Sequence, residues 1–135
     1  EMLEKRMLVF AASIIRKLNT CKSLPKSVID QLTRSSASIG ANYAEACNAV
    51  SKMDFRNKIY IAKKEAAETR YWIDLCIGLS FTGWSDLRQE SHELLVILQT
   101  IVNTKNDTTR TNEITINKIN DGFKTYKSKK FAYLN

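Results

Sequence analysis

The chain has 135 residues, which fits one domain that can bury an apolar core. Hydrophobic residues make up 44% of it and charged residues 26%, with four glycines and one proline; so few helix breakers favour long helices and argue against a β-sandwich or barrel with many tight turns. The net charge of +7 favours a polyanionic partner such as RNA or DNA, although a basic surface also serves solubility alone.

Apolar spacing predicts two helices in the first third of the chain. The first runs from about residue 2 to 19, because apolar residues recur there at three- and four-residue intervals. They are Leu3, Met7, Phe10, Ala11, Ile14 and Leu18. Pro25, which suits a first helical turn, opens the second helix. Its expected buried stripe is Val28, Leu32, Ser35, Ile39, Tyr43 and Ala46. Many small residues between 35 and 46 predict a close contact with a neighbouring helix.

Two further helices follow. Ser51 and Asp54 form an acidic variant of a capping box, which places the start of the third helix near Lys52 and its end within residues 78–83. Its expected stripe is Phe55, Ile59, Ala62, Ala66, Ile73 and Ile77. Asp86 is the expected cap of a fourth helix, whose stripe is Leu87, Leu94, Leu98 and Ile101. Four helices with short connections predict an all-α, antiparallel up-down-up-down four-helix bundle over residues 1–105.

The remaining residues, 106–135, are predicted to be a basic C-terminal extension. The last 33 residues carry +4 of the net charge of +7. Their terminal run, FKTYKSKKFAYLN, interleaves aromatic residues with lysines. Such a run suits single-stranded nucleic acid or an anionic surface, but it is also typical of a solvated chain end.

Targeting signals and ligand motifs are lacking in the sequence. No run of about 18 apolar residues is present, so no membrane span is predicted. The first residues do not resemble a secretory signal, and a cytoplasmic location is expected. Three widely spaced cysteines without a Cys-x-x-Cys pair are interpreted as structural thiols rather than metal ligands or disulfides. They are Cys21, Cys47 and Cys76. No metal or other cofactor is expected.

A basic stripe on the third helix is the candidate nucleic-acid-binding surface. The residues predicted to contact phosphates are Lys52, Arg56, Lys63, Lys64 and Arg70. Tyr60 or Tyr71 could stack on bases beside them. The alternative interpretation is an ordinary solvated helix face, and the sequence alone leaves both open.

Polar residues on the second and third helices predict a structural network. Arg34, Asn42 and Glu45 share one edge of the second helix, where they can meet Glu65 and Glu68 of the third. Removing one partner of such a network costs about 3–5 kcal/mol if the charges are fully buried. The two glutamates could instead form a paired-carboxylate site, but the chain lacks the Glu-x-x-His motifs of a di-metal bundle.

A second apolar stripe on the third helix carries Trp72 and Leu75, which predicts an oligomer interface. The alternative is that Trp72 completes the core of its own bundle. An enzyme is not expected, because no Gly-x-Ser-x-Gly motif, phosphate-binding loop or dinucleotide fingerprint is present. His92 is also the only histidine that could serve as a base.

Two stretches, LPKSVIDQLTRSSASIGANYAEA and FRNKIYIAKKEAAETRYWIDL, carry a family resemblance. The matching positions of the first are Leu24, Pro25, Arg34, Ser38, Ile39, Asn42 and Glu45. Those of the second are Lys64, Glu65, Ala66, Glu68, Thr69, Tyr71 and Trp72. With both motifs in order and at the right spacing, residues 5–105 resemble the four helix bundle protein family, also called 23S rRNA intervening-sequence proteins.

The resemblance implies a bacterial protein that forms a left-handed four-helix bundle and a ring-like homopentamer. Genes of this family often lie inside insertions in ribosomal RNA genes. In a related branch, the accessory variability determinant of diversity-generating retroelements, a basic pentameric barrel binds nucleic acid and a reverse transcriptase. Ala46 departs from the glycine of many relatives, and residues 106–135 extend beyond the common core.

Residues and resemblance together predict a non-enzymatic homo-oligomer, a pentamer, whose basic surface binds RNA or single-stranded DNA without strong sequence preference. The alternative is an assembly module for a protein partner, for example a reverse transcriptase, that touches nucleic acid only incidentally. Neither alternative involves a membrane.

Overall fold

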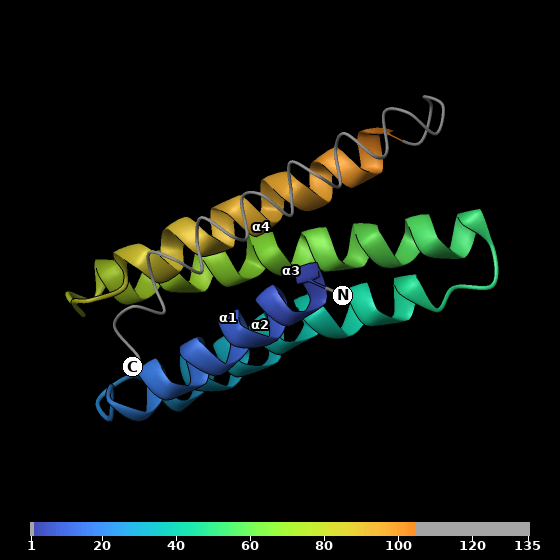
Figure 1. Ribbon diagram of the computed structural model, residues 1–135. Helices are drawn as coiled ribbons and strands as arrows, with labels where there is room; N and C mark the ends of the chain where they lie inside the picture. Colours follow the sequence, from blue (N-terminus) through green and yellow to red (C-terminus); the bar gives the residue numbers. More distant parts are fainter. Residues whose placement is uncertain (1, 105–135) are drawn as a thin grey trace.

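The computed structural model describes residues 2–104, which form four α-helices joined by short connections (Figure 1). The helices are α1 (Met2–Asn19), α2 (Lys26–Cys47), α3 (Lys52–Gly78) and α4 (Ser85–Asn103). Consecutive helices contact each other, and α1 also contacts α4, which closes the bundle. This confirms the predicted all-α, up-down-up-down class. The predicted extension, 106–135, lies outside the described residues.

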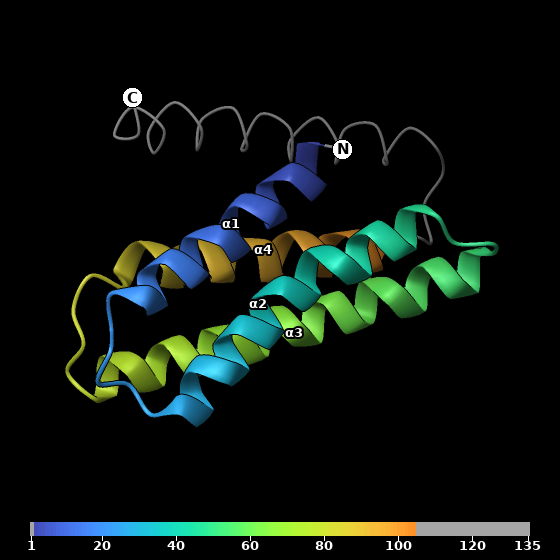
Figure 2. The ribbon, with the colours of Figure 1, turned by 90° about the horizontal axis from the view of Figure 1, so that it is seen from below.

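The helices form two layers, with α1 beside α2 and α3 beside α4 (Figures 1 and 2). The α1–α2 and α3–α4 connections lie at one end of the bundle, and the α2–α3 connection lies at the other (Figure 1). The start of α3 therefore lies at the end of the bundle opposite to the start of α2. Within residues 2–104, none of the helices is long and apolar enough to cross a membrane.

Local signals at the helix ends were informative at two of three predicted positions. Pro25 directly precedes α2, and the Ser51 hydroxyl accepts a hydrogen bond from the Asp54 N–H at 3.0 Å, which confirms the predicted cap of α3. The predicted cap at Asp86 is wrong, because α4 begins at Ser85 and is preceded by Trp84. Asp86 lies in the first turn instead, where a negative charge favours the helix dipole.

The core follows the predicted stripes with one correction in α3. All six apolar residues predicted for α1 are buried, as are most of those predicted for α2 and α4. Ile77 was wrongly placed in the core, since its side chain is 42% exposed. Thr69 and Cys76 are buried instead. Ala62, Thr69 and Cys76 are spaced seven residues apart and therefore lie on one side of α3. Ile77 follows Cys76 by one residue, which turns its side chain by about 100° around the helix and away from that side.

Small residues of α2 bring it close to both neighbouring helices. A Cβ added at Gly40 would lie 3.3 Å from the Cβ of Met7, so α1 and α2 approach tightly there. Facing α3, the Thr69 hydroxyl donates to the Ser35 hydroxyl at 2.9 Å in a buried contact. These contacts confirm the close helix packing predicted from the small-residue run.

All three cysteines are free thiols in the structure. Cys21 and Cys76 are buried in the core, whereas Cys47 is exposed near the end of α2. Burial, together with the neighbouring Cys21, raises the pKa of Cys76 to about 11. Cys76 is therefore protonated at neutral pH and acts as an apolar core side chain.

Candidate nucleic-acid interface

The first half of α3 carries most of the predicted basic stripe. We define the basic patch as Lys52, Arg56, Lys63 and Lys64. Arg56 and Lys64 are exposed and Lys63 is half-buried. Within residues 2–104, no carboxylate forms an ion pair with Arg56, Lys63 or Lys64. Their charges therefore remain available to a polyanion.

Tyr60 lies in the middle of the basic patch. The Cζ atom of Arg56 lies over its ring, 5.7 Å from the centroid, and the Nζ atom of Lys63 lies 5.9 Å from the same centroid. These are cation–π distances, and they follow from the spacing of four and three residues along the helix. The ring and both cations thus form one compact group on the surface of α3.

Charged side chains in the second half of α3 already contact neighbouring helices. The Arg70 guanidinium lies 2.9 Å from Nδ1 of His92 on α4. Asp74 forms an ion pair with Arg88 of α4 at 2.5 Å. The structure therefore separates Arg70, which was predicted together with the basic patch, from Arg56, Lys63 and Lys64, which have no carboxylate partner within residues 2–104.

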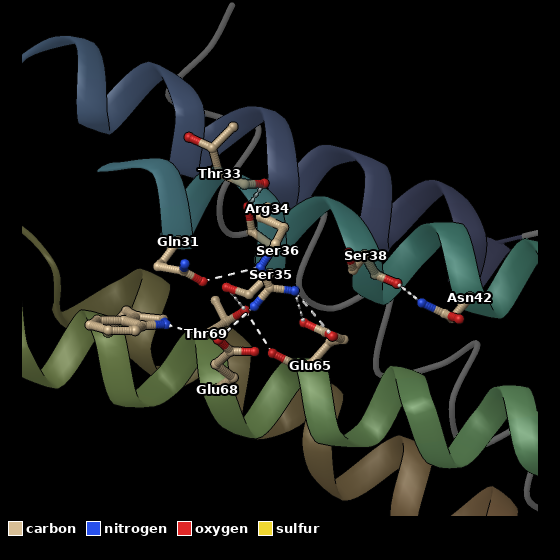
Figure 3. Close-up of polar contacts among 11 residues, drawn as sticks. Gln31, Thr33, Arg34, Ser35, Ser36, Ser38, Asn42, Glu65, Glu68 and Thr69 are labelled. Atoms are coloured by element: carbon tan, nitrogen blue, oxygen red, sulfur yellow. Dashed lines mark hydrogen bonds and ion pairs between the residues drawn. The ribbon is translucent and has the colours of Figure 1, made fainter. Parts of the chain in front are cut away.

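Arg34 of α2 holds both predicted glutamates of α3 (Figure 3). Its Nη1 atom lies 3.0 Å from Glu65 Oε2, and its Nη2 atom lies 2.5 Å from Glu68 Oε1. The hydrogen bond from Arg34 lowers the pKa of Glu68, and the same bond raises the pKa of Arg34. Glu68 is therefore ionised at neutral pH, which does not suit it as a general acid.

Two other residues predicted for this network lie elsewhere. The Asn42 amide donates to the backbone oxygen of Ser38 at 2.8 Å, one turn back along α2 (Figure 3). Glu45 forms an ion pair with Lys58 at 2.6 Å instead of joining Glu65 or Glu68. The reason is that α2 and α3 run antiparallel. Glu45 lies about three turns after Arg34 on α2, so it meets α3 about two to three turns before Glu65 and Glu68. The structure therefore brings together three of the five predicted network residues.

The predicted oligomer-interface residues border the Arg34 cluster. The Trp72 indole donates to Glu68 at 3.2 Å and meets the Tyr71 ring edge-on at a centroid distance of 5.2 Å. Trp72 and Leu75 are both half-buried against the core. Ile61 continues their stripe towards the start of α3 and is 38% exposed. This apolar stripe therefore keeps part of its surface open.

A second open apolar surface lies between α1 and α2. It is a groove of about 660 Å³, lined mainly by small side chains of α2 and the first turns of α1. Leu8, at its edge, is 68% exposed. The bundle thus presents apolar surface both on α3 and between α1 and α2.

The sequence interpretation missed a buried ion cluster between α1 and α4. Arg6 is 2% exposed, and its Nε atom lies 2.6 Å from Oε1 of Glu90, which is 1% exposed. Its Nη2 atom also contacts Glu93 at 2.5 Å. Burial lowers the pKa of Arg6, but the two carboxylates outweigh burial, so the pKa lies above its ordinary value. The signal was available, because Arg6 and Glu90 both occupy apolar-stripe positions.

Side chains that could bind a metal do not converge within residues 2–104. No group of three or more His, Cys, Asp or Glu side chains there has the arrangement needed to hold a metal ion. Glu65 and Glu68, the pair considered for such a site, both point towards the Arg34 guanidinium (Figure 3).

Comparison with known proteins identifies the family to which the bundle belongs. The 23S rRNA-intervening sequence protein family matches residues 3–103. A protein of unknown function from the S23 ribosomal protein family of Bacteroides thetaiotaomicron has a crystal structure that is similar to this chain, with a TM-score of 0.68 and 34% sequence identity. The similarity covers 74% of this chain and 97% of that one. No curated protein sequence matches the chain. The chain therefore belongs to the 23S rRNA-intervening sequence protein family.

Proposed function

We propose that this chain is a non-enzymatic, cytoplasmic protein that assembles into a homopentamer and binds RNA or single-stranded nucleic acid through its basic patch. The observation that carries the proposal is the group of three cations in the first half of α3, Arg56, Lys63 and Lys64, without a carboxylate partner among residues 2–104. By contrast, Lys58 of the same helix forms an ion pair with Glu45, and Arg70 contacts His92. Unpaired cations release the counterions of a nucleic acid when they contact its phosphates.

Assembly is supported by the two apolar surfaces. A closed ring requires a heterologous interface, in which two different patches of each protomer meet. The stripe with Trp72 and Leu75 on α3 and the groove beside Leu8 are two such patches. Repetition of the basic patch around a ring would place several weak phosphate contacts on one nucleic acid, which raises the overall affinity.

Reversing two charges of the basic patch tests nucleic-acid binding. Arg56→Glu/Lys63→Glu is expected to weaken binding of a fluorescein-labelled, 30-nucleotide single-stranded RNA by about tenfold or more, because two phosphate contacts become repulsive. Neutralising both residues with glutamine is expected to reduce the slope of log K against log salt by about 1.4, at about 0.7 per contact. Fluorescence anisotropy between 50 and 200 mM salt measures both.

Lys22→Glu/Lys26→Glu is the matched control. It changes the net charge equally but lies at the α1–α2 connection, at the end of the bundle opposite to the start of α3 (Figure 1). It is expected to change the RNA affinity by less than about threefold. Equal losses in the two double variants would contradict a localised binding surface and would reduce the effect to net charge.

A change at the α3 apolar stripe tests assembly. Five chains of 15.4 kDa give a particle of about 77 kDa. Replacing both Trp72 and Leu75 by serine is expected to dissociate it, because removal of buried apolar area weakens an interface by about 25 cal/mol per Å². Light scattering coupled to gel filtration measures the mass. A native protein that elutes as a monomer would contradict the ring.

The alternative function is an assembly module for a protein partner. It is favoured by large apolar side chains that remain open on α3, such as Met53, at 69% exposed, and Tyr71, at 62%. Salt separates the two functions, because phosphate binding weakens steeply with ionic strength whereas an apolar interface does not.

A further inference from the structure

The two exposed tyrosines of α3 have opposite surroundings. Tyr60 is 38% exposed and Tyr71 is 62% exposed. The residues one helical turn from Tyr60 are Arg56, Asn57, Lys63 and Lys64. Those one turn from Tyr71 are Ala67, Glu68, Asp74 and Leu75. Both carboxylates beside Tyr71 are already paired, with Arg34 and Arg88. Of the two tyrosines of α3, Tyr60 alone therefore combines an open aromatic ring with cations that can hold a phosphate.

We infer that Tyr60 is the base-stacking residue of the basic patch and that it makes the surface prefer unpaired bases to a duplex. This inference rests on the proposed function, because it names the structural class of nucleic acid that the same surface selects. In a duplex, the faces of the bases are already covered by their neighbours, so such a surface can use phosphate contacts alone. An unpaired base can add its face to the tyrosine ring.

The geometry around the ring supports this role. Arg56 and Lys63 lie 5.7 and 5.9 Å from the ring centroid, so both cations are held beside the ring before a ligand arrives. An exposed cation–π contact is weaker than stacking of a base on an aromatic side chain. A base can therefore replace a cation over the ring, and the displaced cation can follow the adjacent phosphate. One nucleotide then engages the ring and a charge together.

The test compares Tyr60→Leu, Tyr60→Phe and Tyr71→Leu in the full chain. The probes are a fluorescein-labelled 20-nucleotide oligouridine and the same strand paired with oligoadenosine, both measured by anisotropy at one salt concentration. Tyr60→Leu is expected to weaken binding of the single strand about tenfold and binding of the duplex less than about twofold. Tyr60→Phe keeps the ring and is expected to bind like the native chain, as is Tyr71→Leu. Far-UV circular dichroism checks that each variant keeps its helices.

A second readout locates the contact directly. Photocrosslinking with 5-bromouridine in the single strand, followed by mass spectrometry, is expected to modify Tyr60 rather than Tyr71. Equal weakening of single strand and duplex by Tyr60→Leu would overturn the inference, since Tyr60 would then act only by positioning Arg56 and Lys63. Unchanged affinity in Tyr60→Leu would also overturn it while leaving the proposed function intact. Absence of binding by the native chain would overturn both.

Discussion

Replacing Arg6 by methionine is expected to lower the free energy of unfolding by about 3–5 kcal/mol. Arg6 and Glu90 are almost completely buried between α1 and α4 and form two hydrogen bonds, at 2.6 and 2.9 Å. Removing the guanidinium leaves the Glu90 carboxylate away from water without its partner, which costs more than the ion pair itself contributes. Urea unfolding followed by circular dichroism measures the change.

Two further variants identify the cause of this loss. Arg6→Met/Glu90→Leu removes both charges and is expected to recover most of the lost stability, because apolar residues of similar size replace the buried pair. Lys26→Met removes one partner of the exposed Lys26–Asp30 pair, whose side chains are 87% and 56% exposed, and is expected to cost less than about 0.5 kcal/mol. A loss in Arg6→Met as small as in Lys26→Met would contradict the burial of an unpaired Glu90 carboxylate in the variant.

Replacing Trp84 by alanine is expected to cost about 3–5 kcal/mol, because it removes the largest fully buried side chain. Trp84→Phe is expected to cost less than half as much. The buried indole Nε1 has no hydrogen-bond partner among the residues that the structure describes. Phenylalanine removes this unsatisfied donor, which offsets part of the packing loss by about 1–3 kcal/mol. Urea unfolding monitored by circular dichroism avoids the change in tryptophan fluorescence.

Trp72→Phe serves as the matched control for the indole donor. Trp72 is half-buried and donates its N–H to Glu68 at 3.2 Å. Here phenylalanine removes a satisfied donor and is expected to cost about 1 kcal/mol. If Trp84→Phe cost as much as Trp84→Ala, the N–H of Trp84 would have to be satisfied in solution.

The helices were predictable because their signals are local. Apolar residues at three- and four-residue spacing gave the bounds of α1 as the structure has them. Pro25 and Ser51 marked the starts of α2 and α3 through their own backbone chemistry. The prediction that Asp86 caps α4 was wrong because a capping residue and a first-turn acidic residue look alike in sequence. Only the backbone conformation of Trp84 and Ser85 distinguishes them.

Contacts between helices were less predictable because they depend on register. Arg34 was correctly placed opposite Glu65 and Glu68. The contact of Glu45 with Lys58, however, depends on the axial offset between α2 and α3. The pairing of Arg70 with His92 likewise depends on the axial position of α4. No local pattern encodes these offsets.

The Arg6 cluster was missed for a different reason. Arg6 lies three residues after Leu3 and four before Phe10, and Glu90 has the same relation to Leu87 and Leu94. Periodicity therefore assigns both to the buried side. Their charges instead predict exposed positions. A charged side chain can be buried only if an opposite charge on another helix lies beside it, and the sequence does not show that such a partner is there.

The contact between Arg6 and Glu90 spans 84 positions of the chain and joins the first described helix to the last. During synthesis, α1, α2 and α3 emerge and can pair with their sequence neighbours while the acidic partners of Arg6 are still missing. The guanidinium stays hydrated until α4 leaves the ribosome. Closure around this charge therefore requires α4, so that a chain interrupted before Glu90 lacks the partner of its buried arginine.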